Sequence, residues 1–159
     1  MVSENNVGTL IKKVLVAVDG SKFSIDAAQA AVFVAEKYSA LLIALNIISS
    51  EVRFEYNEYS IAAGVSGSFH ADVKDALEKG QSLVDEVKKM ASHRSINVQT
   101  DVIVAIRSIV DEIVGYAVRE NIDLIVVGTR GMSGINKLLL GSTASGILRH
   151  SYCPVLIIK

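Results

Sequence analysis

Four glycines, a Ser-Thr pair and two basic residues gather in one short stretch of the chain and could together bind an anion. The stretch reads Gly128-Thr129-Arg130-Gly131-Met132-Ser133-Gly134 and, after six residues that include Lys137, Gly141-Ser142-Thr143. Because glycine has no Cβ, backbone amides can approach a ligand closely there. The hydroxyl groups could donate to an anion, and the two cations could neutralise phosphate charge.

The sequence predicts a strand before this stretch and a helix after it. Residues 122–127 are apolar and β-branched, as in a buried strand, and residues 143–149 have the pattern of a helix. A loop that enters a helix presents unsatisfied N–H groups and the positive end of the helix dipole. We therefore predict a phosphate cradle and a nucleotide site. The alternative is that the glycines only turn the chain and the Ser-Thr pair only caps the helix. Neither a P-loop motif nor a G-x-G-x-x-G after the first strand is present to settle the choice.

An aspartate follows the first predicted strand. Residues 14–18 form an unbroken apolar run, as expected for a central strand covered on both faces, and Asp19-Gly20-Ser21 then turns the chain. Asp19 could bind a ribose hydroxyl or hold Mg²⁺ through water, because hard cations prefer carboxylate and phosphate oxygens. The alternative is an Asx-turn with the two residues that follow.

Strands and helices are predicted to alternate along a single domain that covers residues 1–159. Apolar segments predict strands at residues 14–18, 40–48, 97–106, 124–127 and 155–158. Helical spacing predicts a first helix capped by Ser24 and further helices that begin at Asp72, Ile109 and Thr143. This alternation indicates an α/β fold with an open, five-stranded parallel sheet and right-handed crossovers. Wholly apolar strand cores at 14–18, 102–106 and 124–127 indicate helices on both faces of the sheet.

The long helix and the irregular segments are predicted from the same patterns. The expected buried stripe of residues 72–92 is Val73, Ala76, Leu77, Leu83, Val84, Val87 and Met90, and that of the next helix is Ile113, Val114 and Ala117. Residues 1–11 are predicted to be a loose N-terminal arm. Residues 49–70 are predicted to be a flexible loop, which leaves open a flap near the site, a short extra helix or plain disorder.

Composition argues against several classes of function. Sixteen basic residues against seventeen acidic ones leave a net charge of −1, which gives no basis for binding nucleic acid or an anionic membrane. No apolar run approaches the ~20 residues of a membrane span, and the first residues lack the features of a signal peptide. The single cysteine, Cys153, fits a reducing compartment and is expected to be a buried, inert thiol. We expect a cytoplasmic protein.

The spacing Gly128-x-x-Gly131, then nine residues, then Gly141-Ser142 resembles the ATP-binding signature of the universal stress protein family. Residues 13–21, Lys-Val-Leu-Val-Ala-Val-Asp-Gly-Ser, look like the family's opening strand and its aspartate-containing turn. Residues 153–159, Cys-Pro-Val-Leu-Ile-Ile-Lys, look like its last strand. The resemblance extends over nearly the whole chain, from about residue 12 to residue 159.

This resemblance implies a Rossmann-like domain of the adenine nucleotide alpha-hydrolase type that forms homodimers and binds ATP, or AMP or ADP, accompanied by Mg²⁺ or Mn²⁺. It implies that Asp19 and Ala17 lie near the nucleoside or its metal, with Asp19 as the metal residue, and that Ile47 lines the adenine pocket. The residues that would meet phosphates and ribose are Gly128, Thr129, Arg130, Gly131, Met132, Ser133, Gly134, Gly141, Ser142 and Thr143. Family members often carry a Gly-x-Pro turn before the third helix, whereas this chain has Arg107-Ser108-Ile109.

The sequence favours nucleotide binding over rapid catalysis. Phosphoryl transfer needs positioning, charge neutralisation and an oriented nucleophile, and the third has no convincing candidate here. We expect at most a slow ATPase that works as a nucleotide-responsive dimeric stress or signalling module. The apolar last strand, residues 155–158, would pair antiparallel with its copy to cover an exposed edge. The alternative is a dimeric stress-response module that binds no nucleotide. A receiver domain fits less well, because it needs an acidic pair after the first strand.

Overall fold

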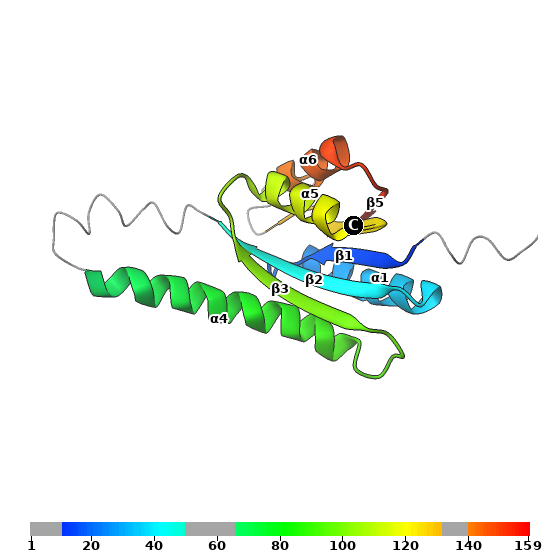
Figure 1. The fold of residues 1–159 in the computed structure, drawn as a ribbon, viewed down its shortest axis with the longest axis horizontal. Helices are drawn as coiled ribbons and strands as arrows, with labels where there is room; N and C mark the ends of the chain where they lie inside the picture. Colours follow the sequence, from blue (N-terminus) through cyan, green and yellow to red (C-terminus); the bar gives the residue numbers. More distant parts are fainter. Residues whose placement is uncertain (1–10, 50–65, 132–139) are drawn as a thin grey trace, which may run out of the picture.

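The computed structural model describes residues 11–49, 66–131 and 140–159, with the backbone alone for residues 66–72. In this part of the chain, five strands form one parallel sheet in the order β3-β2-β1-β4-β5 (Figure 1). The elements are β1 (Lys13–Ala17), α1 (Lys22–Tyr38), β2 (Leu41–Ile48), α4 (Ser66–Met90), β3 (Val98–Val104), α5 (Ile109–Glu120), β4 (Leu124–Gly128), α6 (Ser142–His150) and β5 (Val155–Ile158).

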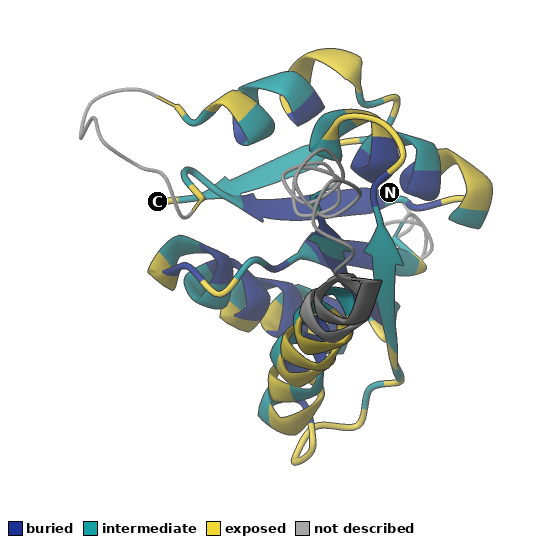
Figure 2. Cartoon of the chain, turned by 90° about the vertical axis from the view of Figure 1, so that its left-hand side faces the viewer, coloured by how far each residue is buried: buried dark blue, intermediate teal, exposed yellow. Residues whose placement is uncertain are grey.

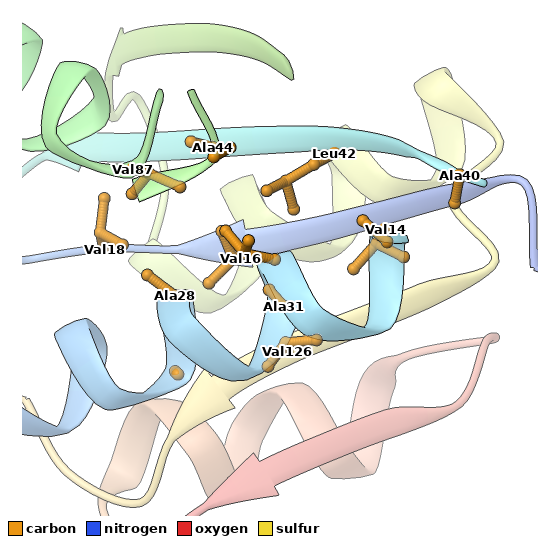
Figure 3. Close-up of a cluster of buried hydrophobic side chains, with 14 of the residues drawn as sticks. Val14, Val16, Val18, Ala28, Ala31, Ala40, Leu42, Ala44, Val87 and Val126 are labelled. Atoms are coloured by element: carbon orange, nitrogen blue, oxygen red, sulfur yellow. The ribbon is translucent and has the colours of Figure 1, made fainter. Parts of the chain in front are cut away.

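Among the described residues, two helices cover each face of the sheet. α1 and α4 pack on one face, and α5 and α6 pack on the other (Figure 1). Alternate residues of β1 divide between the two sides, since Val14 and Val16 join the α1/α4 core and Leu15 joins the α5/α6 core. Figure 3 shows the α1/α4 core, where valines and alanines of strands and helices meet. The predicted α/β fold class is confirmed.

The central position of β1 decides where a ligand could bind. β1 pairs with β2 on one side and with β4 on the other, in registers that set Val16 opposite both Ala44 and Val126. The chain leaves β1 for α1 on one face and leaves β4 for α6 on the opposite face. A crevice forms beyond the carboxyl ends of parallel strands where neighbouring connections diverge in this way. The first and fourth strands are therefore neighbours at the centre of the sheet.

Ser21, and not Ser24, caps α1. Ser21 has an extended backbone, with φ −69° and ψ 154°, and its Oγ accepts a hydrogen bond from the N–H of Ser24 at 3.2 Å. The predicted cap at Ser24 is therefore wrong, because this residue already lies in the first helical turn. An N-cap must precede the helix and accept from an amide two or three residues on, which is the position that Ser21 occupies.

The first part of α4 and the end of β3 also differ from the prediction. α4 begins at Ser66, so the predicted loop of 49–70 is wrong for residues 66–70, while residues 1–10 and 50–65 lie outside the described residues. Glycine and serine are poor helix formers, but propensity is a weak prior that a longer helix overrides. Leu77 of the expected buried stripe is 39% exposed, and most of the exposed surface of α4 lies on its outer side (Figure 2).

β3 is an edge strand that lacks the fully buried core predicted for residues 102–106. It ends at Val104, its apolar residues are half-buried, and Ile106 is 84% exposed. In α5, Ile113 and Ala117 are buried as predicted, whereas Val114 is half-buried. A run of apolar letters does not distinguish a central strand from an edge strand, because burial is set by neighbours that are distant in sequence.

The structure also shows how apolar its helices are and how far its cysteine is buried. Across residues 11–49, 66–131 and 140–159, no helix is both long and apolar enough to cross a bilayer. Cys153 is half-buried and not fully buried, and its Sγ lies 3.6 Å from the hydroxyl of Ser151.

Candidate functional site

The turn after β1 and the glycine loop after β4 meet beyond the carboxyl edge of the sheet. A Cβ added to Gly131 would lie 2.7 Å from Oδ2 of Asp19, so the carboxylate rests directly against the main chain of the loop. The hydroxyl of Ser21 also donates to the carbonyl oxygen of Arg130 at 3.5 Å. The aspartate turn and the glycine loop, which are far apart in the chain, are thus brought together.

The two oxygens of the Asp19 carboxylate face different neighbours. Oδ1 accepts a hydrogen bond from the N–H of Ser21 at 2.9 Å, which is the Asx-turn foreseen as the alternative for this residue. Oδ2 is the oxygen that faces Gly131. The Asx-turn and a ligand role are therefore compatible, because the turn fixes one oxygen and directs the other toward the glycine loop.

Thr129 joins the two glycine segments. Its N–H donates to the carbonyl oxygen of Ile158 at the end of β5, and its own carbonyl oxygen accepts from the N–H of Gly141, both at 2.8 Å. A Cβ on Gly141 would lie only 3.0 Å from that same carbonyl oxygen. The start of α6 is thereby fixed beside the end of β4, where a side chain on Gly141 would not fit without a shift.

The N-terminus of α6 has no side-chain cap. Gly141 is the N-cap residue and lacks a side chain to accept from the first-turn amides. Ser142 and Thr143 already lie inside the helix, so the alternative role predicted for them, as ordinary caps, is wrong. Amides in a first helical turn without a cap are good partners for an anion, and the helix dipole adds positive potential there.

Ala17 and Ile47 are apolar residues near the carboxyl ends of two neighbouring strands. Both are half-buried and pack against the core beneath α5 and α6. Ala17 is the last residue of β1, and Ile47 lies near the end of the neighbouring strand β2, paired in register with Ile103 of β3. The structure therefore places the two residues on the same face of the sheet, near its carboxyl edge.

Thr129 and Arg130 follow directly after β4, at the start of the glycine loop. The guanidinium carbon of Arg130 lies 5.4 Å from the centre of the Phe23 ring, which is a cation–π distance. Oγ1 of Thr129 is buried and has no hydrogen-bond partner in the described structure. A buried hydroxyl without a partner is uncommon in folded proteins, so this atom is a feature that a bound group could satisfy. Met132, Ser133, Gly134 and Lys137 lie outside the described residues.

The Arg107-Ser108-Ile109 turn is held by Glu112, which sequence reasoning missed. Ser108 caps α5, and the Oε1 atom of the buried Glu112 accepts from the backbone N–H groups of Ile106 at 3.1 Å and of Arg107 at 3.0 Å. The hydrogen bond from the Arg107 backbone is the main cause that lowers the pKa of the Glu112 carboxyl. The sequence signal was an acidic residue one turn after a serine cap.

The Arg107 side chain runs back along α5 and not into the crevice. Its Nε lies 4.0 Å from Glu112, and a guanidinium nitrogen lies 3.9 Å from the point where a Cβ on Gly115 would be. Since α5 leads away from the carboxyl edge, the positive charge that replaces the family's Gly-x-Pro turn is directed away from the candidate site.

The described residues do not form a metal site by themselves. No group of three or more His, Cys, Asp or Glu side chains lies close enough to hold an ion within residues 11–49, 66–131 and 140–159. Asp19 is the carboxylate that the crevice offers, with one oxygen engaged by Ser21. A divalent cation would therefore need further oxygens from its ligand, as Mg²⁺ commonly does with phosphates.

Comparison with known proteins places this geometry in a family. The model of the universal stress protein family matches residues 10–159. A universal stress protein of Methanocaldococcus jannaschii is 30% identical over 97% of this chain and 85% of its own. One of Bacillus subtilis is 32% identical over 94% of this chain and 100% of its own.

Solved structures agree with the sequence matches. The universal stress protein UspA of Lactobacillus plantarum has a TM-score of 0.71 and 26% identity, covering 93% of this chain and 97% of its own. A universal stress protein in complex with cAMP has a TM-score of 0.69 and 28% identity, covering 94% of this chain and 98% of its own. With its five-stranded sheet, its glycine loop and these matches along almost its entire length, the chain belongs to the universal stress protein family.

Proposed function

We propose that the protein binds an adenine nucleotide, with ATP as the first candidate, in the crevice between the Asp19 turn and the glycine loop. The observation that carries this proposal is the contact of the Asp19 carboxylate with Gly131, beside a helix α6 that has no side-chain cap. The contact brings an acceptor for hydroxyl groups next to amides suited to phosphate. A simple turn would require neither the contact of Asp19 with Gly131 nor a helix without a side-chain cap.

Each part of the crevice suits one part of a nucleotide. The phosphates would meet the main chain of the glycine loop and the first turn of α6, where Ser142 and Thr143 add hydroxyl donors. The ribose would meet Asp19, and the adenine would lie against Ala17 and Ile47. The related structure in complex with cAMP, at 28% identity, supports an adenine nucleotide as the ligand class.

Asp19 would also hold an accompanying Mg²⁺ or Mn²⁺ together with phosphate oxygens. Such an ion would neutralise phosphate charge. The chain's own contribution is to hold Oδ2 of Asp19 toward the loop through the Ser21 hydrogen bond.

The function that fits this crevice is binding with slow or no hydrolysis. Hydrolysis of a nucleotide needs a group that orients an attacking water. Among the described residues, the carboxylate of the crevice is Asp19, whose Oδ1 is already engaged by Ser21. The bound state would then act as a signal in a stress or signalling module.

We propose further that the protein forms a homodimer through β5. This strand lies at one edge of the sheet, and all four of its residues, Val155–Ile158, are apolar and half-buried. Leu148 of the neighbouring helix α6 is 52% exposed. Antiparallel pairing with a second copy would cover the strand's outer edge. Sedimentation at micromolar concentration should show a dimer, and a monomer alone would contradict this part of the proposal.

Isothermal titration calorimetry with ATP tests nucleotide binding directly. The wild-type protein should bind ATP in MgCl₂, and Asp19→Ala should bind it at least about tenfold more weakly. Asp111→Ala is the matched control, because this exposed aspartate of α5 accepts a hydrogen bond from the hydroxyl of Ser108 and lies outside the crevice. If the wild-type protein binds no ATP, AMP, ADP or cAMP, the alternative of an interaction module without a nucleotide is correct.

A further inference from the structure

Asn46 is the one polar residue of β2, and it lies beneath the turn that carries Asp19. The other residues of the strand are apolar, and Asn46 is only 7% exposed. A buried amide is costly unless it forms hydrogen bonds. Its Nδ2 donates to the carbonyl oxygen of Val18 at 2.8 Å. The orientation of the amide follows from chemistry, since only its NH₂ end can donate to a carbonyl.

This hydrogen bond fixes the peptide group from which Asp19 extends. β1 ends at Ala17, so the carbonyl of Val18 lies beyond the strand, and Asn46 supplies its partner. At the other end of the same peptide group, the N–H of Asp19 donates to Oγ of Ser24 at 3.3 Å. The peptide group is thus held by a side chain at each end, and its rotation would break both contacts.

Helix α4 holds Asn46 from the opposite side. A Cβ added to Gly80 would lie 2.5 Å from Oδ1 of Asn46, so the helix passes directly over the amide. One turn later, Leu83 packs on Gly20, where an added Cβ would lie 3.1 Å from Cδ2 of Leu83. Gly20 has φ +83°, a conformation that other residues rarely adopt. The first contact confines the Asn46 amide, and the second confines the turn that follows Asp19.

We propose that Asn46 is a positioning residue of the nucleotide site and acts through the Val18 carbonyl on the Asp19 carboxylate. The inference rests on the proposed nucleotide binding, to which it adds a residue that is itself buried away from the ligand. Asn46 fixes the main chain, the N–H of Ser21 fixes Oδ1, and Oδ2 is thereby left facing Gly131. In the sequence, Asn46 stands out only as a polar residue within an otherwise apolar segment.

A double-mutant cycle on ATP affinity tests this role. The variants are Asn46→Leu, Asp19→Asn and the pair together, titrated with ATP in MgCl₂. Asn46→Leu keeps the size of the side chain and removes the donor, so it should lower ATP affinity ~10-fold in the wild-type background. In the Asp19→Asn background it should change affinity less than about twofold, because residues that act as a unit are not additive.

Controls separate positioning from a general loss of structure. Asn97→Leu makes the same substitution at an exposed residue just before β3, at the opposite edge of the sheet, and should leave affinity unchanged. Thermal unfolding shows whether each variant is folded. If Asn46→Leu does not fold, Asn46→Thr takes its place in the cycle, because threonine suits a strand and its hydroxyl ends short of the Nδ2 position.

The outcomes distinguish failure of this inference from failure of the proposed function. A wild-type protein without affinity for ATP would overturn both. If the wild-type protein binds ATP and the Asn46 variant binds equally well, Asn46 does not position the site. An equal loss of affinity in the wild-type and Asp19→Asn backgrounds would likewise overturn the inference, since Asn46 would then act independently of Asp19.

Discussion

Gly131→Ala is the substitution that most directly separates a nucleotide site from a simple turn. The new methyl group would lie 2.7 Å from Oδ2 of Asp19, whereas ordinary contacts begin at 3.4 Å. The two atoms must therefore separate by about 0.7 Å. Among the described glycines only Gly20 has a positive φ, so the backbone at residue 131 accepts alanine without strain. The perturbation is thus confined to the contact with the carboxylate.

The expected magnitude follows from how firmly Asp19 is held. Its Oδ1 is tied to the N–H of Ser21 at 2.9 Å, so Oδ2 cannot retreat without weakening that bond. A misplacement of about 1 Å in a binding site can cost roughly 100-fold in function. For the smaller shift here we expect ATP to bind ~10-fold more weakly, which corresponds to about 1.4 kcal/mol. Residue 131 is exposed, so thermal stability should change little.

The assay is calorimetric titration with ATP in MgCl₂, with Gly115→Ala as the matched control. A Cβ at Gly115 would meet only the ends of two arginine side chains, at 3.5 Å and 3.9 Å, on the outer side of α5. This control should bind ATP as the wild-type protein does. If Gly131→Ala also binds ATP with unchanged affinity, Asp19 and Gly131 do not face a common ligand, and the reasoning behind the site is refuted.

Three further predictions concern the framework of the site. Gly128→Ala should lower the free energy of unfolding by ~1–3 kcal/mol in urea denaturation, because the new methyl group would lie 2.6 Å from the carbonyl oxygen of Phe23. A variant as stable as the wild-type protein would contradict this packing. Glu112→Gln should be ~1–2 kcal/mol less stable than the wild-type protein at pH 7, because the hydrogen bonds favour the carboxylate. The folded-state pKa of Glu112 is lowered from the ordinary value of 4.5, so the difference in stability should shrink as the pH falls from 4.5 through that lowered pKa. A constant difference across that range would argue against the role of charge. Burial raises the pKa of Tyr116 from 10.0 to about 12, so the wild-type protein should lose stability as the pH rises from 10 to 12, where the unfolded chain ionises first. Tyr116→Phe should weaken this loss, which is measured by following the unfolding midpoint against pH.

Local patterns in the sequence predicted the parts of the fold that depend on local rules. The helical period predicted a helix that begins at Ile109, and this start is confirmed; in the structure a serine cap precedes it and a left-handed asparagine ends it. β1 was identified as central because an unbroken apolar run needs cover on both faces. The approach of Asp19 to the glycine loop also depends on the adjacency of the first and fourth strands, which local patterns do not fix.

The parts that could not be predicted depend on contacts between distant segments. Asn46 gains its role only when Val18 lies beside β2 and Gly80 of α4 lies over the amide, and these neighbours are 28 residues back and 34 residues ahead in the chain. Ile106 belonged to an apolar run, yet it lies past the end of an edge strand and is 84% exposed. Sequence period reports which residues share a face, but it does not report what covers that face.

Internal packing accounts for two glycines of the family spacing. A Cβ on Gly128 would clash with the backbone of α1, and one on Gly141 would crowd the carbonyl of Thr129. Internal packing therefore explains both glycines even if no nucleotide ever binds. Gly131 differs, because it is exposed and its near neighbour is the carboxylate of Asp19. The case for a nucleotide therefore rests on Gly131, Asp19 and the uncapped start of α6, where a binding experiment discriminates and a stability measurement does not.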